Sequence, residues 1–273
     1  KKNLDQLTYS TVNMIVKTLK DKTDKYSKFI HKDYLTRVVR ENLVSKFSGI
    51  GIEIEKKDDV FFIAKVYKDS SAEEELVMVG DQLIEIEREP VAGWDLKDIE
   101  AALNIPAGDF VELTLRHPDQ TETFQVTLEC RVIWIPSVSS EYYTDKQIGY
   151  IRVTKFRNET AAEFETQLAE LEKNAVRGLV IDMRNNSGGD ETQVIEMSGM
   201  FVPRDTLIVY FMKKDVGRRE ERTRREPRLC PYPVIILVNH KTASSAEIFS
   251  GVMKHYKKAY LVGTRTNGQG SLK

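Results

Sequence analysis

From residue 148 onward the sequence alternates between short apolar segments and amphipathic helical patterns, and this alternation constrains the fold more than any other feature. GLVIDM (178–183) and VIILVN (234–239) are predominantly apolar, which is typical of sheet strands buried on both faces. Helical patterns separate such strands, as in TAAEFETQLAELEKNA (160–175) and SSAEIFSGVMKHY (244–256). We therefore expect residues 148–273 to form an α/β core, a mixed sheet with flanking helices.

The first half of the chain has a different character. Strand-like segments rich in Ile, Val and Phe, separated by Gly, Asp and Pro, predict a small, mostly β unit over residues 47–129. Residues 130–147 are expected to be a β-ribbon linker that leads away from it. Apolar residues at helical spacing predict two helices within residues 1–46.

Composition excludes several classes of function. The net charge of −1 gives no overall indication of a nucleic-acid partner, and the basic run GRREERTRREPR (217–228) is interpreted as a solvated loop or hairpin. No apolar run is long enough to span a membrane. Four scattered histidines form no metal-binding pattern, so no metal or other cofactor is expected. The two cysteines, Cys130 and Cys230, fit either free thiols or one disulfide.

Two loops follow the apolar strands, at the edge where active groups collect in α/β sheets. In RNNSGGD (184–190), the glycines fit either an ordinary turn or a pair of exposed amides, at Gly188 and Gly189, that bind an oxyanion. In NHKTASS (239–245), Ser244 and Glu247 fit a capping box, and Ser244 also fits a nucleophile at a helix N-terminus. The residues alone leave these alternatives open.

Six segments, in order along the chain, resemble the C-terminal processing peptidases, also called tail-specific proteases. They are KTDKYSKFIHKDYL, FSGIGIEIE, GYIRVTKFRNETAAEF, GLVIDMRNNSGGD, VIILVNHKTASSAEIFSG and LVGTRTNGQGSLK. The resemblance implies a serine endopeptidase with an embedded PDZ domain. It assigns Ser244 as the nucleophile, and it assigns the amides of Gly188, with Gly189 as neighbour, and Ser245 to the oxyanion hole.

The sequence departs from the family pattern at the general base. The family lysine lies 25 residues after the nucleophile, where this chain has Gln269, and the family glutamine four residues later is here Lys273. A glutamine amide is not basic and cannot accept the serine proton. Three interpretations stay open: an introduced substitution, a natural relative with weak or no peptidase activity, and Lys273 acting as the base.

The resemblance also predicts a peptide-binding site. In PDZ domains a peptide adds as a strand to a sheet edge, and its carboxylate binds the amides of a glycine-containing loop. The loop and strand here are Gly49, Ile50, Gly51 and Ile52. We expect protein substrates with unstructured C-termini. The alternative is an inactive PDZ scaffold or regulatory protein. Export to the bacterial cell envelope and dimerisation through the N-terminal helices are further expectations from the family.

Overall fold

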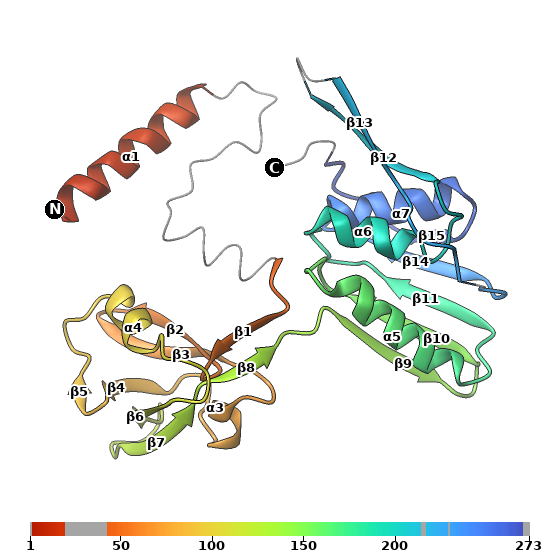
Figure 1. Ribbon diagram of the computed structural model, residues 1–273. Helices are drawn as coiled ribbons and strands as arrows, with labels where there is room; N and C mark the ends of the chain where they lie inside the picture. Colours follow the sequence, from red (N-terminus) through yellow and green to blue (C-terminus); the bar gives the residue numbers. More distant parts are fainter. Residues whose placement is uncertain (1, 20–42, 214–216, 229, 270–273) are drawn as a thin grey trace. The chain divides into compact units, whose positions relative to one another are not determined.

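The computed structural model describes residues 2–19, 43–213, 217–228 and 230–269. The chain divides into two compact units, Lys46–Ile135 and a second unit made of Lys1–Ser45 with Pro136–Lys273. Figure 1 shows the elements of each unit. An N-terminal helix, α1 (Lys2–Leu19), agrees with the first predicted helix, whereas most of the second lies outside the described residues.

The unit Lys46–Ile135 is built on an antiparallel sheet. Its main strands lie in the order β2 (Ile52–Lys57), β3 (Val60–Val66), β4 (Gln82–Ile86), β6 (Phe110–Arg116) and β7 (Phe124–Glu129), and β5 (Glu89–Pro90) pairs with β4. A separate pair joins β1 (Lys46–Gly49) to β8 (Arg131–Trp134). Two short helices, α3 (Ser71–Glu74) and α4 (Leu96–Ala102), complete the unit.

Strand β2 is the edge of this sheet, since it pairs with β3 alone among the described strands. Helix α4 lies near this edge strand. Lys56 Nζ of β2 donates a hydrogen bond (2.9 Å) to the carbonyl of Trp94, which lies two residues before the helix begins. Ile52, Ile54 and Leu96 pack against the same buried core. An open strand edge therefore lies next to a helix.

The second sheet has the order β15 (Tyr260–Gly263), β14 (Val234–Val238), β11 (Gly178–Asp182), β10 (Ile148–Val153) and β9 (Val138–Tyr143). All neighbours are parallel except β9 and β10. Three helices accompany it, α5 (Thr160–Glu172), α6 (Glu191–Ser198) and α7 (Ser245–His255). This mixed sheet with flanking helices, together with the β-rich unit, confirms the predicted fold class.

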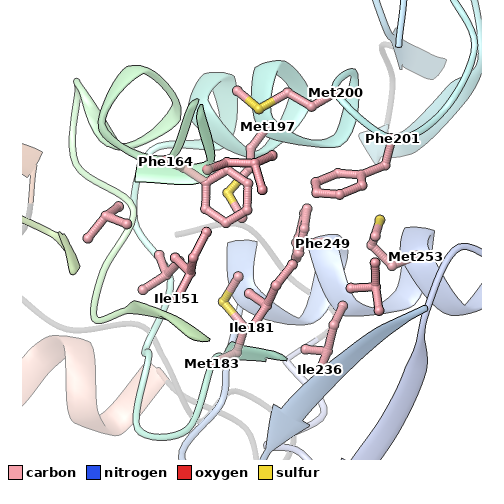
Figure 2. Close-up of a cluster of buried hydrophobic side chains, with 14 of the residues drawn as sticks. Ile151, Phe164, Ile181, Met183, Met197, Met200, Phe201, Ile236, Phe249 and Met253 are labelled. Atoms are coloured by element: carbon pink, nitrogen blue, oxygen red, sulfur yellow. The ribbon is translucent and has the colours of Figure 1, made fainter. Parts of the chain in front are cut away.

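The helices bury one face of the sheet only. Ile151, Ile181 and Ile236 pack with Phe164 of α5, Met197 of α6 and Phe249 of α7 in a core shown in Figure 2. Burial alternates along β14, where Val234, Ile236 and Val238 are buried and the residues between them are partly exposed. The expectation of strands buried on both faces is therefore wrong for the described residues. Apolar composition on both sides of a strand does not guarantee a cover on both sides.

The predicted linker 130–147 is divided between the two units. Its first strand, β8, pairs with β1 in the unit Lys46–Ile135, and β9 is the antiparallel edge of the other sheet. The basic run forms β13 (Gly217–Arg222), which makes a hairpin with β12 (Leu207–Lys213). Both cysteines are free. Among the described residues, no helix is long and apolar enough to cross a membrane.

Candidate functional site

The loops after β11 and β14 lie side by side because these two parallel strands are neighbours. Asn185 and Asn239 exchange two hydrogen bonds, from the Asn185 amide (3.0 Å) and from Asn239 Nδ2 (2.9 Å). The Ala243 amide donates to the Asn186 carbonyl (2.9 Å), and Thr242 Oγ1 donates to the Met183 carbonyl (2.9 Å). These bonds hold the two predicted loops together at the carboxyl edge of the sheet.

The two glycines of the first loop lie directly against the second loop and the neighbouring backbone. A Cβ on Gly188 would lie 2.6 Å from Ser244 Cβ and 3.0 Å from the Ser245 nitrogen. A Cβ on Gly189 would lie 2.0 Å from the Phe156 carbonyl oxygen. Both glycines also have positive φ, which favours glycine over other residues. The close approach of the second loop therefore requires glycine at position 188, and the close approach of the Phe156 backbone requires it at position 189.

Ser244 occupies a sharp turn between β14 and α7. Its backbone has φ 54° and ψ −123°, a conformation that residues other than glycine rarely adopt. Such strain persists only where the surrounding structure enforces it, and it is typical of serines exposed at a strand-to-helix turn. The turn gives Ser244 a position that a serine acting only as a cap does not need.

The amides around Ser244 differ in whether they are already bonded. The Gly188 amide donates to Asn186 Oδ1 (2.8 Å), and Asn186 is itself fully buried. Across the described chain, the amides of Gly189 and Ser245 donate to no acceptor. Ser245 Oγ donates to the Gly189 carbonyl (2.9 Å), which ties the two residues together. The two amides that remain available for an oxyanion are those of Gly189 and Ser245.

Glu247 joins Ser244 to the segment that contains Gln269. Its Oε2 accepts hydrogen bonds from the amides of Ser244 and Gln269, each at 3.0 Å, and its Oε1 accepts one from the Gly268 amide (2.7 Å). The amide nitrogens of Ser244 and Gln269 are therefore no further apart than the sum of these two distances, 6.0 Å. Lys273 lies outside the described residues.

Two family models match the sequence: peptidase family S41 over residues 147–273, and the PDZ domain over residues 39–116. A "Probable CtpA-like serine protease" of Staphylococcus haemolyticus is 31% identical over 271 residues, which are 99% of this chain and 53% of that protein. A protein of the same description from Staphylococcus aureus is 28% identical, with the same coverage of both chains.

This chain belongs to peptidase family S41 and contains a PDZ domain.

The structural comparison agrees at the level of the fold. A solved structure described as the photosystem II D1 C-terminal processing protease has a TM-score of 0.51 and 24% sequence identity. That match covers 97% of this chain and 72% of the other. The chain spans about half the length of the curated S41 relatives that it matches.

The buried carboxylate of Asp182 stabilises the start of the RNNSGGD loop. Asp182, at the end of β11, is fully buried and accepts hydrogen bonds from the Arg184 amide and guanidinium and from the Tyr150 hydroxyl (2.7 Å). Burial acts to raise the pKa of Asp182, but the hydrogen bonds from Arg184 and Tyr150 outweigh it and hold the pKa below its usual value. The ionised Asp182 therefore fixes the start of the RNNSGGD loop.

The residues of the predicted PDZ loop lie between the strands β1 and β2. Gly49 pairs with Arg131 in the β1–β8 ladder, and Ile50 is buried. Gly51 has a φ of 95°, and a Cβ there would lie 2.1 Å from Ser70 Cβ. Ile52 begins the open edge strand β2. The open strand edge of this unit therefore begins at Ile52, just after the tight turn at Gly51.

Sequence reasoning missed three contributors to the S41 site. It predicted that Glu247 caps a helix, but not that its carboxylate also binds the amides of Gly268 and Gln269. It also did not single out Asn186, which binds the Gly188 amide, or the pair of asparagines that joins the two loops, Asn185 and Asn239. The asparagines of the motif RNN were the available signal, since Asn often bonds the backbone in turns. His240, in the loop after β14, is exposed. No cluster of potential metal ligands occurs in the part of the chain that the structure describes.

Proposed function

We propose that this chain is the substrate-binding and serine-bearing part of a C-terminal processing endopeptidase, and that Gln269 disables its proton-transfer step. Ser244 is the nucleophile in this proposal. Its Oγ would attack the carbonyl carbon of a peptide bond, and the amides of Ser245 and Gly189 would stabilise the oxyanion that forms. Gly188 would then serve to bring the two loops together.

One observation carries the proposal: the Glu247 carboxylate binds the amides of both Ser244 and Gln269. The position that holds the lysine base in the resembling family is therefore held next to the serine by a shared acceptor. A residue in this place is suited to take the serine proton if it is basic. Glutamine is not basic, so the Ser244 hydroxyl has no proton acceptor at this position.

A second candidate function follows from the same glutamine. A PDZ-containing S41 chain without a general base can still bind peptide C-termini, in which case it acts as a scaffold or regulatory protein. The open β2 edge beside α4 supports this candidate, because it offers the strand and helix that a PDZ domain uses to bind a peptide.

The test is cleavage of an unfolded model protein by the chain, by three single variants, Ser244→Ala, Gln269→Lys and Lys273→Ala, and by one double variant. We expect no cleavage by the chain itself and cleavage by Gln269→Lys, which is lost again in the double variant Gln269→Lys with Ser244→Ala. Cleavage by the unmodified chain that disappears in both Ser244→Ala and Lys273→Ala would instead make Lys273 the base. No cleavage by any variant, with retained peptide binding, would support the scaffold.

The partners and location remain proposals of the same kind. We propose substrates with unstructured C-terminal segments, which the PDZ unit would hold along β2. Export to the cell envelope and dimerisation through the N-terminal helices are carried over from the family resemblance. Exposed Met14, Ile15 and Leu19 on α1 are compatible with such an interface.

A further inference from the structure

The turn between α3 and β4 of the PDZ unit exposes three large apolar side chains. Leu76 is 77% exposed, Met78 is 50% exposed and Val79 is 63% exposed. The three residues lie within four consecutive positions, and we call the surface that they form the α3–β4 patch. Apolar residues that are exposed singly are common on protein surfaces, whereas a group of them is typical of a surface that binds another molecule.

Leu76 occupies a backbone position that favours glycine. The Leu76 amide donates to the Glu73 carbonyl (3.1 Å), and the Val77 amide donates to the Ala72 carbonyl (2.9 Å). These two bonds are those of a Schellman motif at the end of α3. The motif places Leu76 in the left-handed region, with a φ of 58°, where glycine is the usual residue because it has no Cβ. Neither the backbone nor burial therefore explains a leucine at this position.

The residues around the patch hold it in a fixed shape. Val77, between Leu76 and Met78, is buried and packs in the core of the PDZ unit. The Met78 amide donates to Asp81 Oδ2 (2.8 Å), and Asp81 Oδ1 lies 2.7 Å from His117 Nδ1. A partner that binds here meets a preformed surface, so binding costs little conformational entropy on the side of the patch.

The charges next to the patch are acidic. The segment Ser70–Asp81 contains four acidic residues and no lysine, arginine or histidine. Glu74 pairs with Arg131 (2.7 Å), whereas the carboxylate of Glu75 is exposed and forms an ion pair with no described residue. A surface that joins apolar side chains to lysine or arginine is therefore complementary to the patch, and an anionic surface is repelled by it.

The sheet excludes a strand as the binding partner at this place. Strand β4 pairs with β3 on one side and with β6 on the other, and β5 pairs with β4 as well. No backbone edge is open next to the patch, so an extended peptide could not add to the sheet here. A helix needs no such edge, because it binds through one apolar face.

We propose that the α3–β4 patch binds a cationic amphipathic helix of a partner protein. Apolar side chains of the helix contact Leu76, Met78 and Val79, and a lysine or arginine beside them pairs with Glu75. The patch is distinct from the open β2 edge, because β3 lies between β2 and β4 in the sheet. The inference is independent of the proposed function, since it requires neither Ser244 nor residue 269.

The test uses the whole chain with Ser244→Ala and three fluorescent helical peptides. The first peptide has leucines at i, i+3, i+4 and i+7 and lysines on the opposite face. The second has glutamates in place of the lysines, and the third has alanines in place of the leucines. All have amidated C-termini, so that they lack the carboxylate that a PDZ loop binds. Fluorescence anisotropy should show the first peptide binding at least about tenfold more tightly than the other two.

Leu76→Gly separates binding from folding. It removes the most exposed apolar side chain and gives the Schellman position its preferred residue, so the first peptide should bind at least about tenfold more weakly while the Tm is unchanged or higher. Glu75→Gln should weaken binding about threefold, and less at high salt. Val132→Ser is the matched control, because Val132 is an apolar residue of the same unit that is 62% exposed outside the patch. It should leave the affinity nearly unchanged.

Four outcomes would overturn the proposal. The first is equal affinity of the first peptide for the chain and for Leu76→Gly, and the second is equal affinity of the lysine and glutamate peptides. The third is binding of phosphatidylglycerol vesicles that Leu76→Gly abolishes, which would assign the patch to a lipid surface. The fourth is self-association that Leu76→Gly abolishes without any peptide binding, which would assign it to a second copy of the chain.

Discussion

Helices α4 and α7 make an informative pair, because each lies beside a strand at the edge of a sheet and each begins with a capping box. In α4, the Asp95 amide donates to Asp98 Oδ2 (2.7 Å), and the Asp98 amide donates to Asp95 Oδ1 (3.1 Å). In α7, the carboxylate of Glu247 accepts from the Ser244 amide and also from two amides of a distant segment. The same capping motif therefore only caps the N-terminus of a helix in one unit, whereas in the other it also holds the segment around Gln269 next to Ser244.

This difference separates the features that a unit needs to bind a peptide from those that it needs to cleave one. A strand edge beside a helix is what a PDZ domain uses to hold an extended peptide, and β2 beside α4 offers one. Only α7 begins with a serine in a strained turn, next to unbonded amides and next to the position of the family base. We infer that the start of helix α7 distinguishes the S41 unit from the PDZ unit.

The largest expected losses of stability come from replacing the closely packed glycine in each unit. Gly189→Ala would place a Cβ 2.0 Å from a backbone oxygen, and Gly51→Ala would place one 2.1 Å from Ser70 Cβ, both at positive φ. We expect each to destabilise its own unit by at least about 3 kcal/mol, because backbone strain and overpacking add.

Hydrogen exchange followed separately in the two units measures this prediction. Gly189→Ala should raise exchange in β11 and β14, and Gly51→Ala should raise it in β2 and β3. Gly93→Ala is the control: it has a positive φ but open space, so it should cost about 1 kcal/mol. Equal effects of Gly189→Ala and Gly93→Ala would contradict the close approach of the Phe156 backbone to Gly189.

A smaller effect is expected from removing the carboxylate of each capping box. Glu247→Ala removes three hydrogen bonds to a charged acceptor and should release the segment around Gln269, at a cost of about 2–3 kcal/mol. Asp98→Ala should cost about 1 kcal/mol, because its carboxylate serves the exposed end of a short helix. Hydrogen exchange at Gly268 and Gln269 should rise sharply in Glu247→Ala only. Unchanged hydrogen exchange at Gly268 and Gln269 would contradict the claim that Glu247 holds this segment in place.

The smallest expected effect is a pH-dependent loss of stability when Asp182 is replaced. The folded-state pKa of Asp182 is lowered, so the stability that it contributes is present above the ordinary aspartate pKa of about 3.9 and is lost as the pH falls through the folded-state value. Asp182→Asn should cost about 1–2 kcal/mol near neutral pH and progressively less in acid. Urea unfolding of the S41 unit between pH 7 and pH 3 measures this change.

Glu112→Gln is the matched control for Asp182→Asn. Glu112 pairs with the exposed Arg88 on the PDZ unit, so its replacement should change stability by less than about 1 kcal/mol. A loss in Asp182→Asn that does not depend on pH would contradict the ionised state assigned to Asp182.

The sequence predicted what depends on local pattern. Strand and helix types, the two loops at the carboxyl edge and the position of Ser244 before α7 all follow from apolar periodicity and turn residues. The cover of the sheet could not be predicted, because the apolar residues Ile235 and Leu237 do not reveal whether another layer packs on them. The second role of Glu247 was equally hidden, since Gly268 and Gln269 lie 21 and 22 residues away in sequence.

The central claim is that residue 269, held beside Ser244 by Glu247, decides whether the serine proton can leave. The most direct measurement is the rate at which Ser244 reacts with a fluorophosphonate, followed by intact mass, in the chain and in its Gln269→Lys and Gln269→Met variants. The account predicts a rate at least about 100-fold higher in Gln269→Lys than in the other two, which is the usual contribution of a general base. Equal rates in all three would contradict it.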